Sequence, residues 1–250
     1  LLHDGLIPQI TFSKSQILLI TGILGTTISP YLFFWQTSQE IEEEISNGQK
    51  TIRSRKGTNP AEVKEMRADI WVGMFLSNLV MFFIIAVCAN TLFINGITTI
   101  DTAADAASAL RPLAGHWAFL LFAIGIIGTG LLAIPVLAGS TAYAISESFG
   151  WKEGLYRKFK TAHAFYGVII ASIIIGILIN FIGIDPIKAL VYSAIANGIV
   201  APVILIFIVR ISSSKKIMGE YRNKPITRFL GWTATVLMSI AAIATIISLF

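Results

Sequence analysis

Long apolar runs, separated by short stretches that hold nearly all the charge, constrain this 250-residue chain more than any other feature. A bilayer core about 30 Å thick is crossed by roughly 20 apolar residues in a helix. Four runs reach that length and a fifth closes the chain: Ile70–Phe93, Trp117–Ile145, Phe165–Ile184, Ala189–Ile211 and Phe229–Phe250. The runs predict an all-α protein that crosses a membrane several times.

The composition supports a membrane protein and excludes several other classes. Charged residues make up 13 % of the chain, about half the roughly 25 % of a soluble domain, and the mean hydropathy is +0.75. A single cysteine excludes a disulfide-stapled secreted domain. The basic residues behind the net charge of +5 lie between the apolar runs, as in a membrane protein with several spans, so we predict no nucleic-acid partner. Motifs of ATP-driven pumps, hydrolases and metalloproteases do not occur, and we predict no enzyme.

The first apolar segment differs from the others because it is short and interrupted. Ser15–Ser29 is apolar, Pro30 follows, and apolar sequence resumes over Tyr31–Trp35. Proline disrupts a helix because it lacks an N–H and its ring clashes with the preceding turn. We therefore predict two half-helices that cross the membrane together, with a break over Gly25–Pro30, which brings the count to six spanning segments.

The basic residues alternate between the loops. Successive loops hold six, one, four, one and six basic residues over 46–69, 96–115, 150–162, 183–188 and 210–228. Because cytoplasmic loops carry the excess of Lys and Arg, we place 46–69, 150–162 and 210–228 in the cytoplasm and both chain ends outside. The expected location is a cell membrane, with the lipid bilayer as partner.

An Ala-rich stretch, residues 101–111, favours a short surface helix. Asp101 is expected to cap its first turn, and Pro112 to stop it. No repeat or low-complexity tract divides the chain, so residues 1–250 are expected to form a single transmembrane domain. Because the chain begins at Leu1 and not at Met, we expect a fragment of a longer protein.

The break carries the most informative chemistry. Pro30 leaves the carbonyl of Thr26 without a backbone partner, and such a group costs roughly several kcal/mol in hydrocarbon. Many secondary transporters hold a cation with unwound carbonyls at a broken helix. One interpretation is therefore an ion site, with Gly25 adding flexibility and with hydroxyls supplied by Thr26, Thr27 and Ser29. The alternative is a plain proline kink that the hydroxyls relieve.

Beyond the break, Glu40, Glu43 and Glu44 follow Gln36 at helical spacing and lead toward the cytoplasm. One interpretation is an exit vestibule that attracts cations. The other is a solvated helix end facing the basic loop that follows. We favour the second for Glu42–Glu44 and leave both open for Gln36 and Glu40.

Asn197 is a polar residue within the run Ala189–Ile211. Its amide needs hydrogen-bond partners when it is buried. A neighbouring helix supplies them in the commoner case, and coordination of an ion by the amide oxygen is the alternative.

The segment GILGTTISPYLFFWQTSQEIEEE, residues 22–44, resembles the discontinuous sixth helix of the Nramp family of divalent-metal transporters. The likeness continues through NLVMFFIIAVCANTLF, ALRPLAG, FAIGIIGTGLLAIPVLAGSTAYAISESFGW and GIDPIKAL, and covers essentially the whole chain. The resemblance implies a LeuT-type fold of two inverted five-helix repeats. This chain would hold the second repeat and one further helix, and the first repeat would be needed to complete the site.

The family pattern Ala-x-x-Met-Pro-His falls on Thr26, Ser29, Pro30 and Tyr31. The resemblance implies that the metal binds the backbone carbonyl of Thr26, the side chain of Ser29, and Asn197 at the family's helix-ten glutamine. A thioether favours transition ions, whereas the Ser29 hydroxyl is a hard ligand, so Mg²⁺ is the alternative to Mn²⁺ or Fe²⁺. We expect the pathway and its gate to involve Gly25, Thr27, Pro30, Tyr31, Gln36 and Glu40.

These features together predict a secondary active transporter of a divalent metal cation that works by alternating access. No cofactor is expected. The resemblance implies the bacterial inner membrane as the location and protons as the coupling ion, although Tyr31 stands where the family's proton route has histidine. Two further hypotheses stay open. One is a transporter of a small organic solute, such as an amino acid, on the same architecture. The other is a non-transporting membrane protein, because serine and tyrosine replace the family's methionine and histidine.

Overall fold

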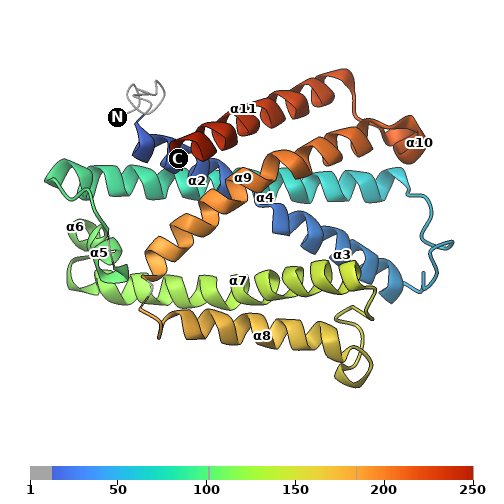
Figure 1. The fold of residues 1–250 in the computed structure, drawn as a ribbon, viewed down its shortest axis with the longest axis horizontal. Helices are drawn as coiled ribbons and strands as arrows, with labels where there is room; N and C mark the ends of the chain where they lie inside the picture. The colour runs from blue at the N-terminus through green and yellow to red at the C-terminus, as the bar shows by residue number, and fades with distance from the viewer. Residues whose placement is uncertain (1–12, 101, 184, 250) are drawn as a thin grey trace. The chain divides into compact units, whose positions relative to one another are not determined.

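The computed structural model describes residues 13–100, 102–183 and 185–249, and all regular structure within them is helical (Figure 1). The chain forms two compact units. Unit 1 contains the residues up to Pro30 and those from Lys188 onward, and unit 2 contains Tyr31–Ile187. Asp101, Ile184 and Phe250, each of which bounds a predicted element, lie outside the described residues.

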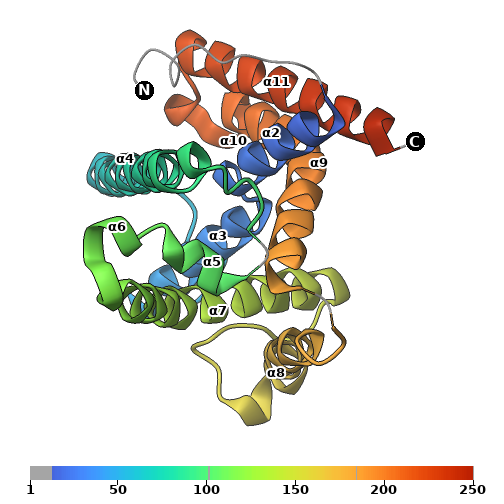
Figure 2. The same ribbon diagram turned by 90° about the vertical axis from the view of Figure 1, so that its left-hand side faces the viewer.

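Unit 1 is built from α2 (Lys14–Thr27), most of α9 (Pro186–Ser213), α10 (Lys215–Met218), η4 (Gly219–Tyr221) and α11 (Pro225–Leu249). Helix α2 lies along α11, as Figures 1 and 2 show. Two buried threonines join them: the hydroxyls of Thr21 and Thr245 are 2.7 Å apart, and Thr21 also donates to the carbonyl of Ala241 at 3.2 Å. Interhelical hydroxyl bonds of this kind stabilise helix pairs inside membranes.

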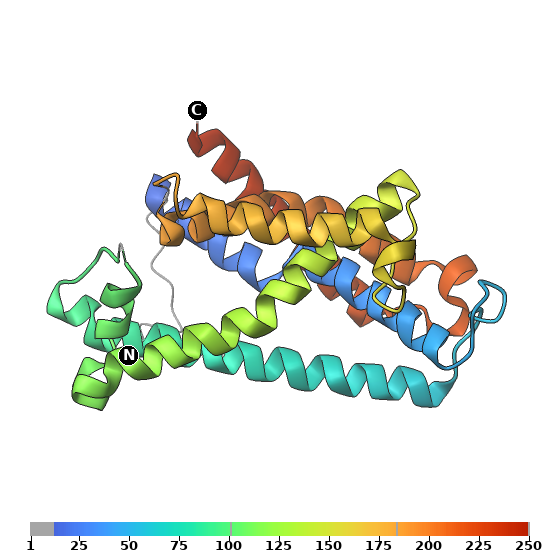
Figure 3. The same ribbon diagram turned by 90° about the horizontal axis from the view of Figure 1, so that it is seen from below.

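Unit 2 contains α3 (Pro30–Ser46, after its first residue), α4 (Pro60–Thr91), η1 (Phe93–Asn95), α5 (Ala103–Ser108), α6 (Arg111–Ala114), η2 (Gly115–Trp117), α7 (Ala118–Phe149), η3 (Phe159–Thr161), α8 (His163–Ile179) and the start of α9. Helices α7 and α8 lie side by side (Figures 1 and 2). A core of Ala142, Tyr143, Ala162 and Phe165 joins them. Helix α7 bends part-way along its length in Figure 3, and Pro135 inside it supplies a cause.

Helix α4 begins well before its apolar run, because its first turn is strongly capped. The Asn59 side chain accepts from the Glu62 N–H at 2.9 Å, and the Glu62 carboxylate accepts from the Asn59 N–H at 3.1 Å. Pro60 follows the cap, where its missing N–H costs nothing. No residue of α4 is buried against the rest of the described chain. Most of its surface is exposed and is available to lipid or to other protein.

Five helical spans of the described chain are long and apolar enough to cross a membrane, with α2 and α3 counted as one. They are Lys14–Ser46, Pro60–Asn95, Gly115–Phe149, Pro186–Ser213 and Pro225–Leu249. The sixth predicted span is shorter than expected, because α8 has 17 residues and so extends about 25 Å. It ends at Ile179. The side-chain amide of the next residue, Asn180, donates to the carbonyls of Gly176 and Ile177 at 3.4 Å, and Gly183 then takes a φ of 79°.

The single surface helix predicted over 101–111 is wrong in its details. Thr102 caps α5, since its hydroxyl accepts from the Asp105 N–H at 3.2 Å and the Asp105 carboxylate accepts from the Thr102 N–H at 2.9 Å. The helix ends at Ser108, and Pro112 lies in the first turn of the separate helix α6. Proline is tolerated in a first turn, so it does not stop a helix there.

Candidate functional site

The candidate site begins where α2 stops and α3 starts. Helix α2 ends at Thr27, and its last backbone bond runs from the Ile28 N–H to the Leu24 carbonyl at 2.9 Å. Ile28 then leaves helical geometry with φ −111° and ψ 82°, and α3 begins at Pro30. The break predicted over Gly25–Pro30 thus occupies two residues, Ile28 and Ser29.

The hydroxyls at the break turn back onto α2. Ser29, only 6 % exposed, donates to the carbonyl of Thr26 at 2.9 Å. Thr26 and Thr27 both donate to the carbonyl of Ile23, at 2.8 and 2.9 Å. The Thr26 carbonyl therefore lacks a backbone partner but accepts a side-chain bond. The two threonine hydroxyls satisfy the helix, as local side-chain bonds often do.

The Thr26 carbonyl oxygen and the Ser29 hydroxyl oxygen are spaced so that both can bind the same metal ion. They lie 2.9 Å apart. Adjacent oxygens around an octahedral ion with bonds of about 2.1 Å lie roughly 3 Å apart. The two atoms can therefore occupy neighbouring positions of one coordination shell, once the Ser29 proton points away from the carbonyl.

Helix α9 crosses α2 beside this pair with the two backbones in contact. A Cβ atom added to Gly25 would lie 2.9 Å from the Cα of Gly198 and 2.5 Å from its nitrogen, and one added to Gly198 would lie 2.5 Å from the Thr21 carbonyl oxygen. Asn197 belongs to this turn of α9 and is half-buried. Its amide has no hydrogen-bond partner within the described ranges. The crossing thus places the turn that carries Asn197 against the last turn of α2.

Past the break, α3 is joined to α7. The Tyr31 carbonyl accepts from the buried Ser140 hydroxyl at 2.6 Å. One turn on, the Trp35 ring lies directly over Gly139 and meets the Tyr143 ring edge-on, with centroids 6.2 Å apart. The sequence analysis did not single out Ser140 or Tyr143. The run of small residues before Tyr143 was the available signal, because small residues let helices approach closely.

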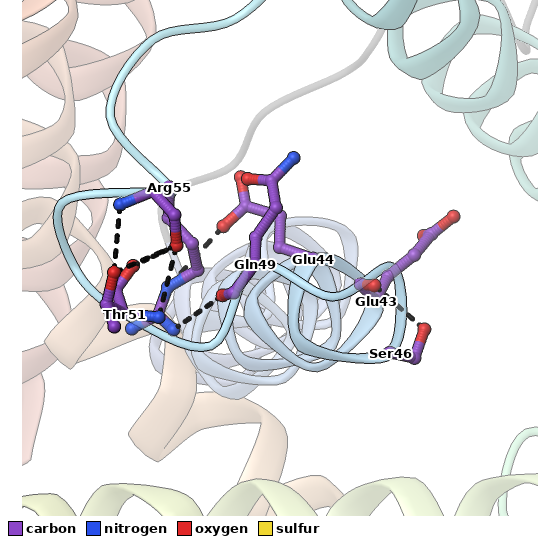
Figure 4. Close-up of polar contacts among 7 residues, drawn as sticks. Glu43, Glu44, Ser46, Gln49, Thr51 and Arg55 are labelled. Atoms are coloured by element: carbon purple, nitrogen blue, oxygen red, sulfur yellow. Dashed lines mark hydrogen bonds and ion pairs between the residues drawn. The ribbon is translucent and has the colours of Figure 1, made fainter.

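The acidic stripe divides into two parts. Gln36 is exposed, whereas Glu40 and Glu43 line a pocket of about 560 Å³ together with carboxylates from the first turns of α4. Glu44 also lines it but pairs with Arg55, Nε to carboxylate oxygen 3.7 Å, and Arg55 in turn donates to the Gln49 carbonyl (Figure 4). The interpretation of a helix end facing the basic loop therefore holds for Glu44.

Glu42 is not solvated as predicted. Its carboxylate accepts hydrogen bonds from the Tyr143 hydroxyl and from the Leu155 N–H. Helical periodicity explains the difference, because Glu42 lies on the Trp35 side of α3, toward α7. The contact brings the C-terminal end of α3 to the loop that follows α7. Two of the loops predicted to be cytoplasmic, 46–69 and 150–162, thus begin at the same end of unit 2.

The same loop holds a second partly buried carboxylate. Burial raises the pKa of Glu153, and the nearby Glu147 carboxylate raises it further. One of its oxygens, Oε2, is buried without a hydrogen-bond partner among the described residues. The loop after α7 therefore carries an acid that favours the protonated form more than an ordinary glutamate does.

Comparison with known proteins identifies the family. The sequence pattern of the Nramp family, described as natural resistance-associated macrophage protein-like, matches residues 1–248. The chain belongs to the Nramp family. Membership confirms the family predicted from the sequence, a family of membrane-embedded transporters and not of enzymes.

Curated Nramp relatives share the name divalent metal cation transporter MntH. The relative from Caldanaerobacter subterraneus subsp. tengcongensis is 27 % identical over 232 residues, which cover 92 % of this chain and 50 % of the relative. The relative from Clostridium acetobutylicum is 25 % identical over 240 residues, 94 % of this chain and 51 % of its own length. The relative from Aeromonas hydrophila is 25 % identical over 235 residues, with 92 % and 52 % covered. The chain spans about half the length of the curated relatives it matches.

Proposed function

We propose that the full-length protein that carries this chain moves a divalent metal cation, Mn²⁺ or Fe²⁺, across a bacterial cell membrane by secondary active transport. The oxygen pair of Thr26 and Ser29 at the helix break carries the proposal, and the Nramp membership and the name of the curated relatives support it. The proposal includes a LeuT-type fold in which this chain forms the second repeat and one further helix, with α8 as the sixth span.

The proposed ligands from this chain are the Thr26 carbonyl, the Ser29 hydroxyl and the Asn197 amide oxygen. All three are neutral, so the charge of the ion must be balanced elsewhere. Divalent ions in proteins take carboxylate ligands for this purpose. The first repeat is the proposed source of the acidic ligand, and water completes the shell.

Alternating access requires the backbone at the site to change between states. Ile28 and Ser29, outside either helix, are the proposed hinge. Protons are the proposed coupling ion. Tyr31 stands where the family pattern has histidine, so this position does not supply the imidazole that takes up and releases protons near neutral pH.

Mg²⁺ is the second candidate, because Ser29 supplies a hard oxygen where the family pattern has a thioether. Mg²⁺ prefers oxygen ligands in octahedral geometry and keeps several waters. An organic solute on the same architecture is the remaining alternative. Such a transporter would have no acidic ligand in the first helix, so the upstream sequence distinguishes the two.

Uptake by the full-length protein in proteoliposomes tests the proposal. Mn²⁺, Fe²⁺ and Mg²⁺ are each supplied to the parent, to Ser29→Ala and to Thr129→Ala. We expect Ser29→Ala to lose at least on the order of 10- to 100-fold in apparent metal affinity, the range that follows even the loss of an outer-shell partner of a metal ligand. Thr129→Ala is the matched control, since Thr129 lies in α7 outside the proposed pathway and its hydroxyl bonds to the Gly125 carbonyl, and it should transport normally.

Two outcomes would contradict the proposal. The first is uptake of all three metals at background while an amino acid accumulates. The second is unchanged metal affinity in Ser29→Ala, which would remove Ser29 from the coordination shell. Ser29→Met provides a further check, because a thioether should raise the preference for Mn²⁺ and Fe²⁺ over Mg²⁺.

A further inference from the structure

A pocket of about 620 Å³ lies in unit 1 where α9 ends and α11 begins, far along the chain from the helix break. This volume falls in the range of about 300–1,000 Å³ that is usual for small-molecule sites. The residues that define its chemistry are Ser213, Arg222, Lys224, Arg228, Phe229 and Trp232.

The pocket is strongly basic and its charge is not neutralised by the protein. Arg222, Lys224 and Arg228 line it with a single acidic residue, Glu220. All three basic side chains are exposed, and none forms an ion pair within 4 Å in the part of the chain that the structure describes. Three cations around one cavity repel one another, so the arrangement favours a bound anion.

The pocket is held in shape by bonds that do not involve its charges. The Asn223 N–H donates to the Ser212 carbonyl at 2.8 Å, and the Asn223 side-chain amide donates to the Ser212 hydroxyl at 2.8 Å. These bonds tie the loop before α11 to the end of α9. The Arg228 N–H donates to the Lys224 carbonyl at 3.0 Å and starts the hydrogen-bond ladder of α11. The basic side chains therefore project from a fixed backbone.

The pocket lies at the boundary between polar loop and apolar helix. Four lining residues lie on one face of α11. The helix begins at Pro225, and the other three are three, four and seven residues further on: Arg228, Phe229 and Trp232. Phe229 is 70 % exposed and opens the apolar run that continues to the end of the helix. Aromatic rings at such a boundary sit at the level of the lipid headgroups.

We propose that this pocket binds the phosphate of an anionic phospholipid in the cytoplasmic leaflet. Arg222, Lys224 and Arg228 would bind the phosphate oxygens, and Phe229 and Trp232 would lie against the glycerol and the first acyl carbons. Basic pockets at the cytoplasmic side of membrane helices suit such headgroups. Inorganic phosphate offers the same oxygens, but it gives the two aromatic rings nothing apolar to contact.

The test compares two charge-matched triple variants of the full-length protein in detergent. The pocket variant carries Arg222→Gln, Lys224→Gln and Arg228→Gln. The control carries Arg210→Gln, Lys215→Gln and Lys216→Gln, which remove the same charge from α9 and α10, within the same basic region 210–228 but outside the pocket. Binding of phosphatidylglycerol and of phosphatidylcholine is measured by native mass spectrometry.

We expect the parent to bind phosphatidylglycerol in preference to phosphatidylcholine. The pocket variant should bind phosphatidylglycerol on the order of 100-fold more weakly, since each basic residue near an anionic lipid contributes about fivefold. The control should lose clearly less, because its three residues do not line the pocket. Equal losses in the two variants would show diffuse attraction by the whole loop and would overturn the proposal, as would equal binding of the two lipids by the parent.

A second measurement separates lipid from free phosphate and does not depend on the stability of the triple variants. Phosphatidylglycerol with brominated acyl chains should quench part of the parent's tryptophan fluorescence, and Trp232→Phe should lose that part. Millimolar inorganic phosphate should leave phosphatidylglycerol binding unchanged. Full competition by phosphate, or quenching that is the same in Trp232→Phe, would contradict a lipid site.

Discussion

The backbone contact between α2 and α9 predicts that Gly25 tolerates no side chain. A Cβ at this position would lie 2.9 Å from the Gly198 Cα, whereas carbon atoms in contact prefer about 3.5–4.0 Å. The neighbouring atoms belong to the backbone of α9 and cannot rotate away, so the helices must separate by roughly 1 Å. Overpacking of this kind costs about 1–3 kcal/mol.

Gly22→Ala is the matched control for Gly25→Ala. Gly22 is buried in the same helix, but an added Cβ there would lie 3.7 Å from Ile195 Cγ1, an ordinary contact. The exchange should be neutral or should stabilise by up to about 1 kcal/mol, because alanine favours helix more than glycine does. Thermal unfolding of the full-length protein in detergent measures both variants, and metal uptake then tests the effect on the site.

The expected result is a lower Tm for Gly25→Ala than for Gly22→Ala, with reduced uptake in the first variant only. Separation of the helices would also move the turn that carries Asn197 away from the break. Equal Tm values for the two variants would refute the close crossing. A lower Tm with uptake unchanged would show that the crossing is structural and that its spacing does not govern the site.

Two further predictions concern unit 2. Tyr143→Phe should lower the free energy of unfolding by about 1.5–3 kcal/mol, because it removes a donor from the Glu42 carboxylate. Tyr166→Phe loses only bonds to carbonyls and should cost about 1 kcal/mol. Denaturant unfolding compares the two variants, and equal losses would contradict a charged partner for Tyr143. Glu153→Gln should be more stable than the parent at neutral pH. The raised pKa means that the folded state binds more protons, so the parent loses stability as pH rises from the ordinary glutamate pKa through the raised one, and the advantage of Glu153→Gln should vanish in acid. An advantage that persists at low pH would contradict this origin.

The sequence predicted the features that depend on local chemistry. Hydropathy located the apolar spans, and Pro30 located the break, because a missing N–H has the same consequence in every helix. The alternation of basic loops agrees with the contact that brings Glu42 to Leu155, at one end of unit 2. These predictions need no knowledge of which helices are neighbours.

Features that depend on the choice among equivalent partners were not predictable. The sequence places three hydroxyls near the break, on Thr26, Thr27 and Ser29, and does not show which carbonyl each one bonds to. The non-helical backbone of Ile28 directs the Ser29 hydroxyl to the Thr26 carbonyl. Glu42 lies in a run of three glutamates, and its direction toward Tyr143 depends on how α3 packs on α7. The end of α8 likewise depends on the Asn180 side-chain amide, which bonds to a carbonyl that the next helical N–H would otherwise use.

In the proposed transport cycle, the hydrogen bond from Ser29 to Thr26 would stabilise the state that carries no metal ion. A transporter of this kind must return without cargo, and a bare carbonyl in a dry interior would make that return costly. The Ser29 hydroxyl would donate to the Thr26 carbonyl in the ion-free state and would turn away when an ion binds. A neutral hydrogen bond is worth about 0.5–1.5 kcal/mol, so breaking this one would weaken ion affinity by roughly tenfold at most. The proposed transporter would thus bind its ion slightly more weakly and return without an ion at a lower free-energy cost.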